Sequence, residues 1–348
     1  MESADKIFVH GLGAVSPAGW GMNFFRDALK KNEPLPTTDL LRPGWTKPLR
    51  VRSVPTPSPR PAFISHARLR RTSPIAQFAT AAALEALGED ATKITTGNFR
   101  LGLVVAVLAG CVNYTRRFYD ETLRDPASAS PLVFPETVFN APSSHIAALL
   151  GTTAINYTLV GDPGTFLQGV ALAADWLLAD KVDGCLVLGA DEKDWLIADA
   201  FHLFQRNAIV SEGAGAIYFR REKKSEQAIK LGAVTDAHLF LQKQTRAAAA
   251  KKMREQFSDI SENTLLCDGQ QNLSALDAAE KKAWSDWRRA RLSPKTIFGE
   301  GLVAGAAWQC LAAIDALQQG LFNAANVSVV GTNQQAIGAQ FVRTNAKD

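Results

Sequence analysis

The chain has 348 residues, with 38 Lys and Arg against 34 Asp and Glu, so its formal net charge is +4. A chain of this length buries about three quarters of its unfolded surface and needs no disulfides for stability. The small charge excess is scattered and not interleaved with aromatic residues, which argues against a nucleic-acid groove. No apolar run reaches membrane-spanning length and no signal-peptide segment precedes the first strand, so we expect a cytoplasmic protein.

Short basic runs occur at residues 68–71, 220–224 and 251–252. We interpret them as solvated faces, with docking of an acidic carrier protein as the alternative. The cysteines are far apart and form no CxxC pair, and the five histidines do not cluster. Metal sites need such clusters, so we expect neither a metal nor another cofactor. Cys185 and Cys310 lie in apolar runs and are predicted to be small buried hydrophobes.

Strand and helix patterns alternate along the first part of the chain. The predicted elements are a strand at 6–10 that stops at Gly11–Gly13, a helix at 77–88, a strand at 101–107, a helix at 166–179, and strands at 185–190 and 213–219. Residues 33–75, rich in Pro, Arg and Thr, are expected to form a surface excursion. Continuously apolar strands separated by helices indicate a sheet covered on both faces.

A polar stretch at 220–230 leads into a second series of elements. It comprises strands at 231–234, 264–267, 327–330 and 339–342, and helices near 240–256, 275–285 and 302–319. The element order predicts two related α/β halves, residues 1–220 and a shorter half at 226–348.

Six segments in chain order carry a family resemblance. They are residues 9–19, 130–147, 188–192, 211–216, 294–306 and 331–333. Together they resemble the β-ketoacyl synthases. The resemblance implies a thiolase-like α/β fold, with the two halves layered as α-β-α-β-α. In that family, the segment that matches residues 130–147 approaches the dimer partner.

The resemblance also implies a Cys that forms an acyl-thioester. Counting back from Glu192 places that Cys on Gly164, within one or two residues, yet residues 162–166 contain neither Cys nor Ser. A Gly side chain cannot carry an acyl group. Thr165 is the hydroxyl at this point, and we expect it to be a helix cap.

The two histidines of the family fall on Asp268 and Glu300, while its Lys is retained as Lys295. Ionised carboxylates accept hydrogen bonds and cannot donate them to a thioester carbonyl. We therefore expect no catalytic residue. Lys295 is expected to form an ion pair with Glu300 or with Asp268, and altered acid–base chemistry on the two carboxylates is the alternative. Cys267, beside Asp268, is predicted to be a buried strand residue and not a displaced nucleophile.

Loss of all three positions resembles the chain-length factor, the silent half of a ketosynthase heterodimer in type II polyketide systems. Residues 130–142 are more similar to the corresponding subunits of aryl polyene clusters. The resemblance implies an active ketosynthase subunit and an acyl carrier protein as partners, in polyketide, aryl polyene or fatty-acid-like chain elongation. The complex would be a 3-oxoacyl-carrier-protein synthase, and the chain by itself would not be an enzyme.

By the same resemblance, Leu132, Val133 and Phe134 would project towards the partner's acyl tunnel and limit chain length by excluded volume. The alternative is that they fill the local core. The strand near 154–160 is expected to be the edge that pairs with the partner. Two other functions stay open: an acyl-thioester transferase or hydrolase that uses Asp268, Glu300 or Thr165, and a homodimeric carrier-binding module.

Overall fold

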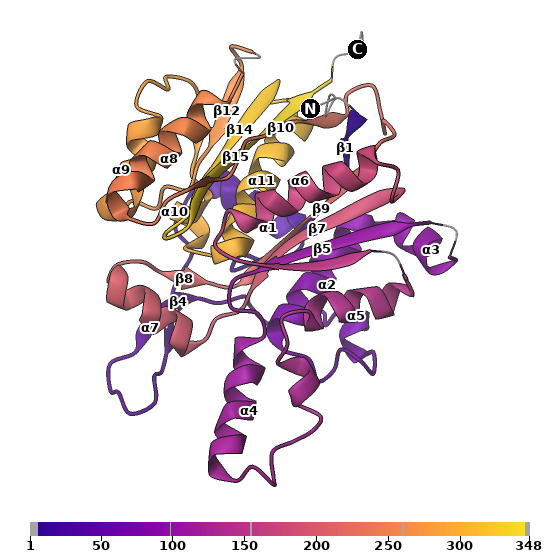
Figure 1. Cartoon of the computed structure of the whole chain (residues 1–348), viewed down its shortest axis with the longest axis vertical. Helices are drawn as coiled ribbons and strands as arrows, with labels where there is room; N and C mark the ends of the chain where they lie inside the picture. The colour runs from indigo at the N-terminus through magenta and orange to yellow at the C-terminus, as the bar shows by residue number, and fades with distance from the viewer. Residues whose placement is uncertain (1–5, 98, 154, 259–260, 345–348) are drawn as a thin grey trace.

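The computed structural model describes residues 6–97, 99–153, 155–258 and 261–344 (Figure 1). Within these residues a large mixed sheet has the strand order β13-β12-β14-β15-β10-β1-β9-β7-β5-β6. Its strands are β1 (Phe8–Ser16), β5 (Leu101–Val107), β6 (Asn156–Val160), β7 (Gly184–Asp191), β9 (Gly213–Arg220), β10 (Ile229–Val234), β12 (Thr264–Cys267), β13 (Arg291–Leu292), β14 (Ala324–Val330) and β15 (Gln335–Arg343). Two short strands, β2 (Gly19–Trp20) and β11 (His238–Leu239), pair with β1 and β15 respectively.

The sheet consists of two sections that meet between β1 and β10, where Phe8 pairs with Lys230. In the first section β5 runs parallel to β6 and β7, and β9 runs antiparallel to both β7 and β1. In the second section β12 runs parallel to β13 and β14, and β15 runs antiparallel to β14 and β10.

Helices cover and separate the two sections. They are α1 (Met22–Lys31), α2 (Pro74–Leu87), α3 (Asp90–Thr95), α4 (Val112–Arg124), α5 (Ala141–Leu150), α6 (Thr165–Leu178), α7 (Trp195–Phe204), α8 (Lys243–Glu255), α9 (Ser274–Ala283), α10 (Pro294–Phe298) and α11 (Leu302–Gln318). The main hydrophobic cluster places α6 and α11 between the sections, where apolar residues on every side of α11 are buried. A second cluster packs α2 and α5 on the first section, and a third packs α8 and α9 on the second.

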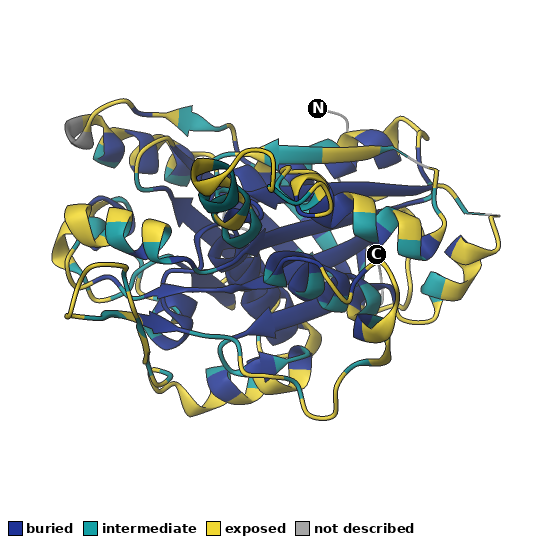
Figure 2. Ribbon diagram, turned by 90° about the horizontal axis from the view of Figure 1, so that it is seen from below, coloured by how far each residue is buried: buried dark blue, intermediate teal, exposed yellow. Residues whose placement is uncertain are grey.

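This arrangement confirms the predicted thiolase-like α/β fold with α-β-α-β-α layers. Figure 2 shows the buried strands and central helices inside, with exposed residues on the outer helices and loops. The predicted boundaries of the two halves, 1–220 and 226–348, stay a prediction. No helix in the described part of the chain has both the length and the apolarity to span a bilayer. Residues 1–5, and Ala154 of the predicted edge strand, lie outside the described residues.

The first strand does not stop where the sequence predicts. It continues through Gly11 and Gly13 to Ser16. A Cβ on Gly11 would lie 1.9 Å from the carbonyl oxygen of Ala86, and one on Gly13 would lie 2.0 Å from that of Ala82. These glycines therefore allow the backbone of α2 to approach the strand closely, a role that a turn-forming pattern does not distinguish.

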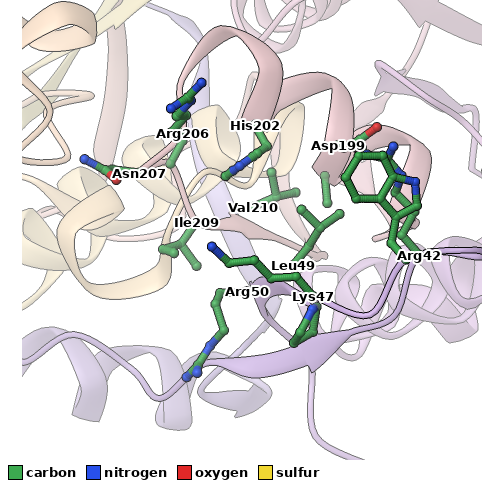
Figure 3. Close-up of a pocket in the computed structure, with 14 residues that line it drawn as sticks. Arg42, Lys47, Leu49, Arg50, Asp199, His202, Arg206, Asn207, Ile209 and Val210 are labelled. Atoms are coloured by element: carbon green, nitrogen blue, oxygen red, sulfur yellow. Dashed lines mark hydrogen bonds and ion pairs between the residues drawn. The ribbon is translucent and has the colours of Figure 1, made fainter.

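The predicted excursion at 33–75 contains an exposed hairpin of strands β3 (Thr38–Leu40) and β4 (Leu49–Arg52). Strand β4 pairs in parallel with β8 (Val210–Ser211), which follows α7 in the chain. This pairing holds the hairpin next to α7 (Figure 3). Val51 and Arg52 are buried at this junction.

Candidate functional site

The position predicted for the nucleophile lies at the N-terminus of α6. Gly164 directly precedes the helix, and its N–H donates to Asp162 Oδ1 at 3.1 Å. A Cβ built on Gly164 would lie 2.8 Å from Cγ of Gln335 and 2.8 Å from Cγ2 of Ile337. Both distances are well inside van der Waals contact, so side chains of β15 occupy the space that a nucleophile would need.

Asp162, and not Thr165, accepts the hydrogen bonds of the backbone N–H groups at the start of α6. Its carbonyl oxygen accepts the N–H of Thr165 at 2.9 Å, and its carboxylate accepts Gln335 N at 3.1 Å and Gln335 Nε2 at 2.9 Å. Burial raises the pKa of Asp162, and these hydrogen bonds oppose the rise. Thr165 is the first residue of the helix and makes no capping hydrogen bond, so the prediction that it caps the helix is wrong.

Asp268 follows β12 and is fully buried. Its carboxylate accepts hydrogen bonds from Arg291 Nη1 at 2.8 Å, Ser293 Oγ at 2.6 Å and Gln270 Nε2 at 2.8 Å. Burial raises the pKa of Asp268, while Ser293 and Arg291 act in the opposite direction. The carboxylate is therefore surrounded by donors from its own chain and offers little capacity to a substrate.

Glu300 is also fully buried and forms an ion pair with Lys295, whose Nζ lies 2.8 Å from Glu300 Oε2. Glu300 accepts two further hydrogen bonds, from Gln271 Nε2 at 3.1 Å and from the Leu302 N–H at 3.0 Å. Of the two ion pairs that the sequence left open, the structure thus contains Lys295–Glu300, and Asp268 pairs with Arg291 instead.

The structure brings these predicted positions into one buried region. The neighbouring residues Gln270 and Gln271 bind Asp268 and Glu300 respectively. Burial raises the pKa of Asp162 beside Gly164, and the positive charge of Lys295 is one of the causes that oppose this rise. The region contains acceptors already bound to donors of the same chain. These hydrogen bonds and ion pairs join segments that are far apart in the chain, and the carboxylates of Asp162, Asp268 and Glu300 accept hydrogen bonds from the chain itself.

Comparisons with known proteins identify the fold. No protein-family profile and no curated protein sequence matches the chain. Solved structures do match it. One described as the ishigamide ketosynthase/chain length factor is 17% identical, with a TM-score of 0.81 over 98% of this chain and 100% of that chain. The chain has the ketosynthase fold.

Two further structures support that assignment of the fold. The ketosynthase ApeO in complex with its chain length factor ApeC from Xenorhabdus doucetiae is 13% identical, with a TM-score of 0.80 over 97% of this chain and 98% of that chain. A β-ketoacyl synthase from Burkholderia phymatum STM815 is 13% identical, with a TM-score of 0.81 over 98% of this chain and 100% of that chain.

The thiols of this ketosynthase fold lie away from solvent. Cys111, Cys185, Cys267 and Cys310 are all free and buried. Burial raises the pKa of Cys267 well above its usual range, and the neighbouring Asp268 adds to the rise. A thiol in that state is a poor nucleophile. Among the residues that the structure describes, no group of His, Cys, Asp and Glu side chains could hold a metal ion.

Sequence reasoning missed several members of the buried region. Arg246 of α8 donates to the carbonyl oxygens of Gly331, Leu276 and Val330. Glu280 of α9 accepts the Gly269 N–H at 3.0 Å. Arg246 stands in an Ala-rich helix and Glu280 in a charged one, so no local pattern marks them as buried.

A cavity of about 520 Å³ opens beside this region, between α7 and α8. Asp162, Arg246 and Asn333 contribute its polar lining. Phe204 and Leu241 also line it and are largely exposed.

The predicted gating residues lie elsewhere, near the exposed helix α4 that projects from the body in Figure 1. Leu132 is 72% exposed and Phe134, which begins the short helix η3 (Phe134–Glu136), is 56% exposed; Val133 is buried. The ring of Phe134 lies 5.4 Å from that of Phe118 of α4. The alternative prediction, that these three residues fill the local core, is therefore correct for Val133 but not for Leu132 and Phe134.

Strand β6 borders the sheet, since it pairs with β5 and ends the strand order of the described residues. Tyr157 and Val160 of this strand are each 52% exposed. Tyr119 and Leu123 of α4 are exposed as well. We refer to β6, α4, Leu132 and Phe134 together as the open face; each presents apolar side chains to solvent, and β6 also presents a strand edge.

Proposed function

We propose that the chain is a non-catalytic ketosynthase-like subunit, a chain-length factor, that pairs with an active ketosynthase and shapes its acyl pocket. The observation that carries the proposal is the packing around Gly164. Gln335 and Ile337 fill the space beside it, so this scaffold of a condensing enzyme has no room for an acyl-carrying side chain.

The similar structures support the choice of partners. Two of them are described as ketosynthases with chain length factors, and a third, 14% identical, as a ketosynthase bound to a type II polyketide acyl-carrier protein. We infer an active ketosynthase and an acyl carrier protein as partners of this chain, in the cytoplasm. The resemblance of residues 130–142 to the subunits of aryl polyene and related pigment clusters supports a pathway of that kind.

The open face supports pairing. An unpaired strand edge that carries exposed aromatic and apolar side chains is a hazard for a monomer, and association with a second subunit removes it. Leu132 and Phe134 would then reach the partner's acyl tunnel, where their volume limits how long the chain can grow.

The alternative of an altered transferase or hydrolase receives less support. Asp268 and Glu300 are fully buried, and each is engaged by a cation of the same chain. A nucleophile or general base needs lone pairs that face a substrate.

Co-expression with an active ketosynthase from the same organism tests the proposal. We expect a soluble one-to-one complex on size-exclusion chromatography, and no acylation of the isolated chain by acyl- or malonyl-thioesters in intact-mass measurements. Separate elution of the two subunits, or a stable acyl adduct on this chain, would contradict it.

The gating role has its own test in the assembled complex. Phe134→Ala should lengthen the products, because it removes volume from the proposed end of the tunnel. Phe24→Ala is the matched control, since Phe24 is also 56% exposed but lies on α1. Unchanged product length with Phe134→Ala would remove the gating role and leave the pairing intact.

A further inference from the structure

The segment that carries the proposed gating residues has little regular structure of its own. We call residues 132–137 the gate segment. It contains the short helix η3, in which Phe134 is 56% exposed and lies 5.4 Å, between ring centres, from Phe118. Such short 3₁₀ turns have poor hydrogen-bond geometry and give a segment little rigidity. Side chains of neighbouring helices must therefore hold the gate segment if Phe134 is to form a fixed wall.

One of these side chains is His145 of α5. Its Nε2 lies 2.9 Å from Oε2 and 3.0 Å from Oε1 of Glu136, the last residue of η3. Both side chains are mostly buried, with 11% of His145 and 16% of Glu136 exposed. Hydrogen bonds to a carboxylate are stronger than those between neutral groups, and exclusion of water strengthens them further. This hydrogen bond ties the end of η3 to α5.

The other ring nitrogen of His145 makes no hydrogen bond. Nδ1 is buried and has no partner among the residues that the structure describes. A buried polar atom without a partner destabilises the folded chain, whereas an apolar side chain of similar size would not. Packing alone therefore does not explain a histidine at this position. The contact that distinguishes it from an apolar residue is the one to Glu136.

The two helices that hold the gate segment differ in their own support. Thr115 of α4 donates from Oγ1 to the carbonyl oxygen of Thr137, 3.1 Å away, but α4 projects from the body (Figure 1). In contrast, α5 packs on the first sheet section through Ile146 and Leu150, which are buried in the second hydrophobic cluster. The hydrogen bond from His145 therefore connects the gate segment to the core.

We propose that His145 is a positioning residue for the acyl pocket. Through Glu136 it fixes η3, and it thereby holds Phe134 at the point where growth of the acyl chain stops. The inference rests on the proposed function, because it requires Phe134 to limit chain length. It adds that this limit depends on a support that locks the gating side chain in place, and not on side-chain volume alone.

The test measures the lengths of the products made by the assembled complex with its ketosynthase. His145→Leu keeps a buried side chain at this position but removes the donor to Glu136. The ratio of longer products to the main wild-type product should rise by about tenfold, because loss of a charge-assisted hydrogen bond favours the displaced gate segment by that factor. Glu136→Ala removes the other partner of the hydrogen bond and should have the same effect.

Three further variants separate positioning from folding. Glu136→Gln keeps an acceptor oxygen for Nε2, so it should retain the wild-type product lengths. Ser143→Ala is the matched control on α5, because it removes a hydrogen bond to Thr158 of β6 and not one to the gate segment; product lengths should stay unchanged. With Phe134→Ala already present, His145→Leu should add no further lengthening, since its effect passes through Phe134.

Wild-type product lengths in both His145→Leu and Glu136→Ala would overturn the positioning role. Equal lengthening by Ser143→Ala would overturn it too, and so would lengthening by His145→Leu that adds fully to that of Phe134→Ala. Unchanged product length in Phe134→Ala itself would contradict the proposed gating, and this inference would fall with it. The variant that fails thus shows whether the positioning or the gating is wrong.

Discussion

The surroundings of Gly164 and the open face differ in whether the chain itself provides packing and hydrogen-bond partners for their side chains. Around Gly164, Asp268 and Glu300, buried polar groups meet donors and cations of the same chain, and side chains of β15 fill the remaining space. On the open face, Tyr157 and Phe134 meet solvent. The comparison teaches that the first region is satisfied within the chain, whereas the second leaves apolar side chains and a strand edge available for the partner that we propose.

Among the variants proposed here, one that breaks the buried ion pair should change the free energy of unfolding the most. Lys295→Met leaves Glu300 buried without its cation, so the free energy of unfolding should fall by about 3–5 kcal/mol, measured by urea denaturation. Lys281→Met is the control, because Lys281 is exposed and lies 3.5 Å from Asp277; its loss should be below about 1 kcal/mol. Equal losses in both variants would mean that the buried pair has no special role.

Charges on the strand edge should break pairing without unfolding the chain. Tyr157→Asp together with Val160→Asp places two carboxylates on β6, where the proposed interface excludes water. We expect at least about 2 kcal/mol weaker association with the ketosynthase, measured by titration calorimetry. Leu239→Asp on β11 tests whether any new surface charge has this effect. Undiminished association of the β6 variant would move the interface elsewhere.

Adding a single methyl group at Gly164 tests whether its space is filled. Gly164→Ala should lower the free energy of unfolding by about 1–3 kcal/mol, because the new Cβ overlaps Gln335 and Ile337. Gly305→Ala on α11 is the matched control: its nearest contact would be 3.7 Å from Lys295, so it should be neutral or stabilising. Tolerance of Gly164→Ala would show that a side chain fits at the nucleophile position.

The stability of the chain should also depend on pH. Burial raises the pKa of Asp191 to about 7 and raises the pKa of Glu280 as well. The folded state therefore holds protons that the unfolded state has released above about pH 4, and stability should fall as the pH rises from 5 to 7. Each group contributes at most about 1.4 kcal/mol per pH unit.

Glu280→Gln should reduce that slope in urea denaturation series across pH 5–8. Glu226→Gln, at an exposed position, should leave the slope unchanged. Identical slopes for the wild type and Glu280→Gln would mean that Glu280 is ionised throughout this range.

Much of the fold could be predicted because its signals are local. The apolar run at 101–107 corresponds to β5 residue for residue, and the helix predicted at 166–179 is α6, displaced by one residue. The prediction that the first strand stops at Gly11–Gly13 is wrong, because a glycine that lets a helix pack closely on a strand looks the same in the sequence as a glycine that makes a turn.

The candidate site was less predictable because its contacts join distant parts of the chain. Lys295 and Glu300 are five residues apart. This spacing alone does not decide whether Lys295 pairs with Glu300 or with Asp268, so the sequence predicts either ion pair. The side chains that fill the space at Gly164 come from β15, far along the sequence. Gln335 of the same strand donates a hydrogen bond to the carboxylate of Asp162. No pattern near residue 164 could have revealed them.

Strand β1 has a consequence for how the polypeptide is made. It is synthesised before both of its long neighbouring strands, since Phe8 pairs with Arg220 on one side and with Lys230 on the other. Until those later residues are synthesised, the strand has both edges uncovered, which favours slow folding and transient aggregation. Nascent chains that end before Lys230 should therefore depend on chaperones, and fragments truncated before β9 should not accumulate as stable proteins.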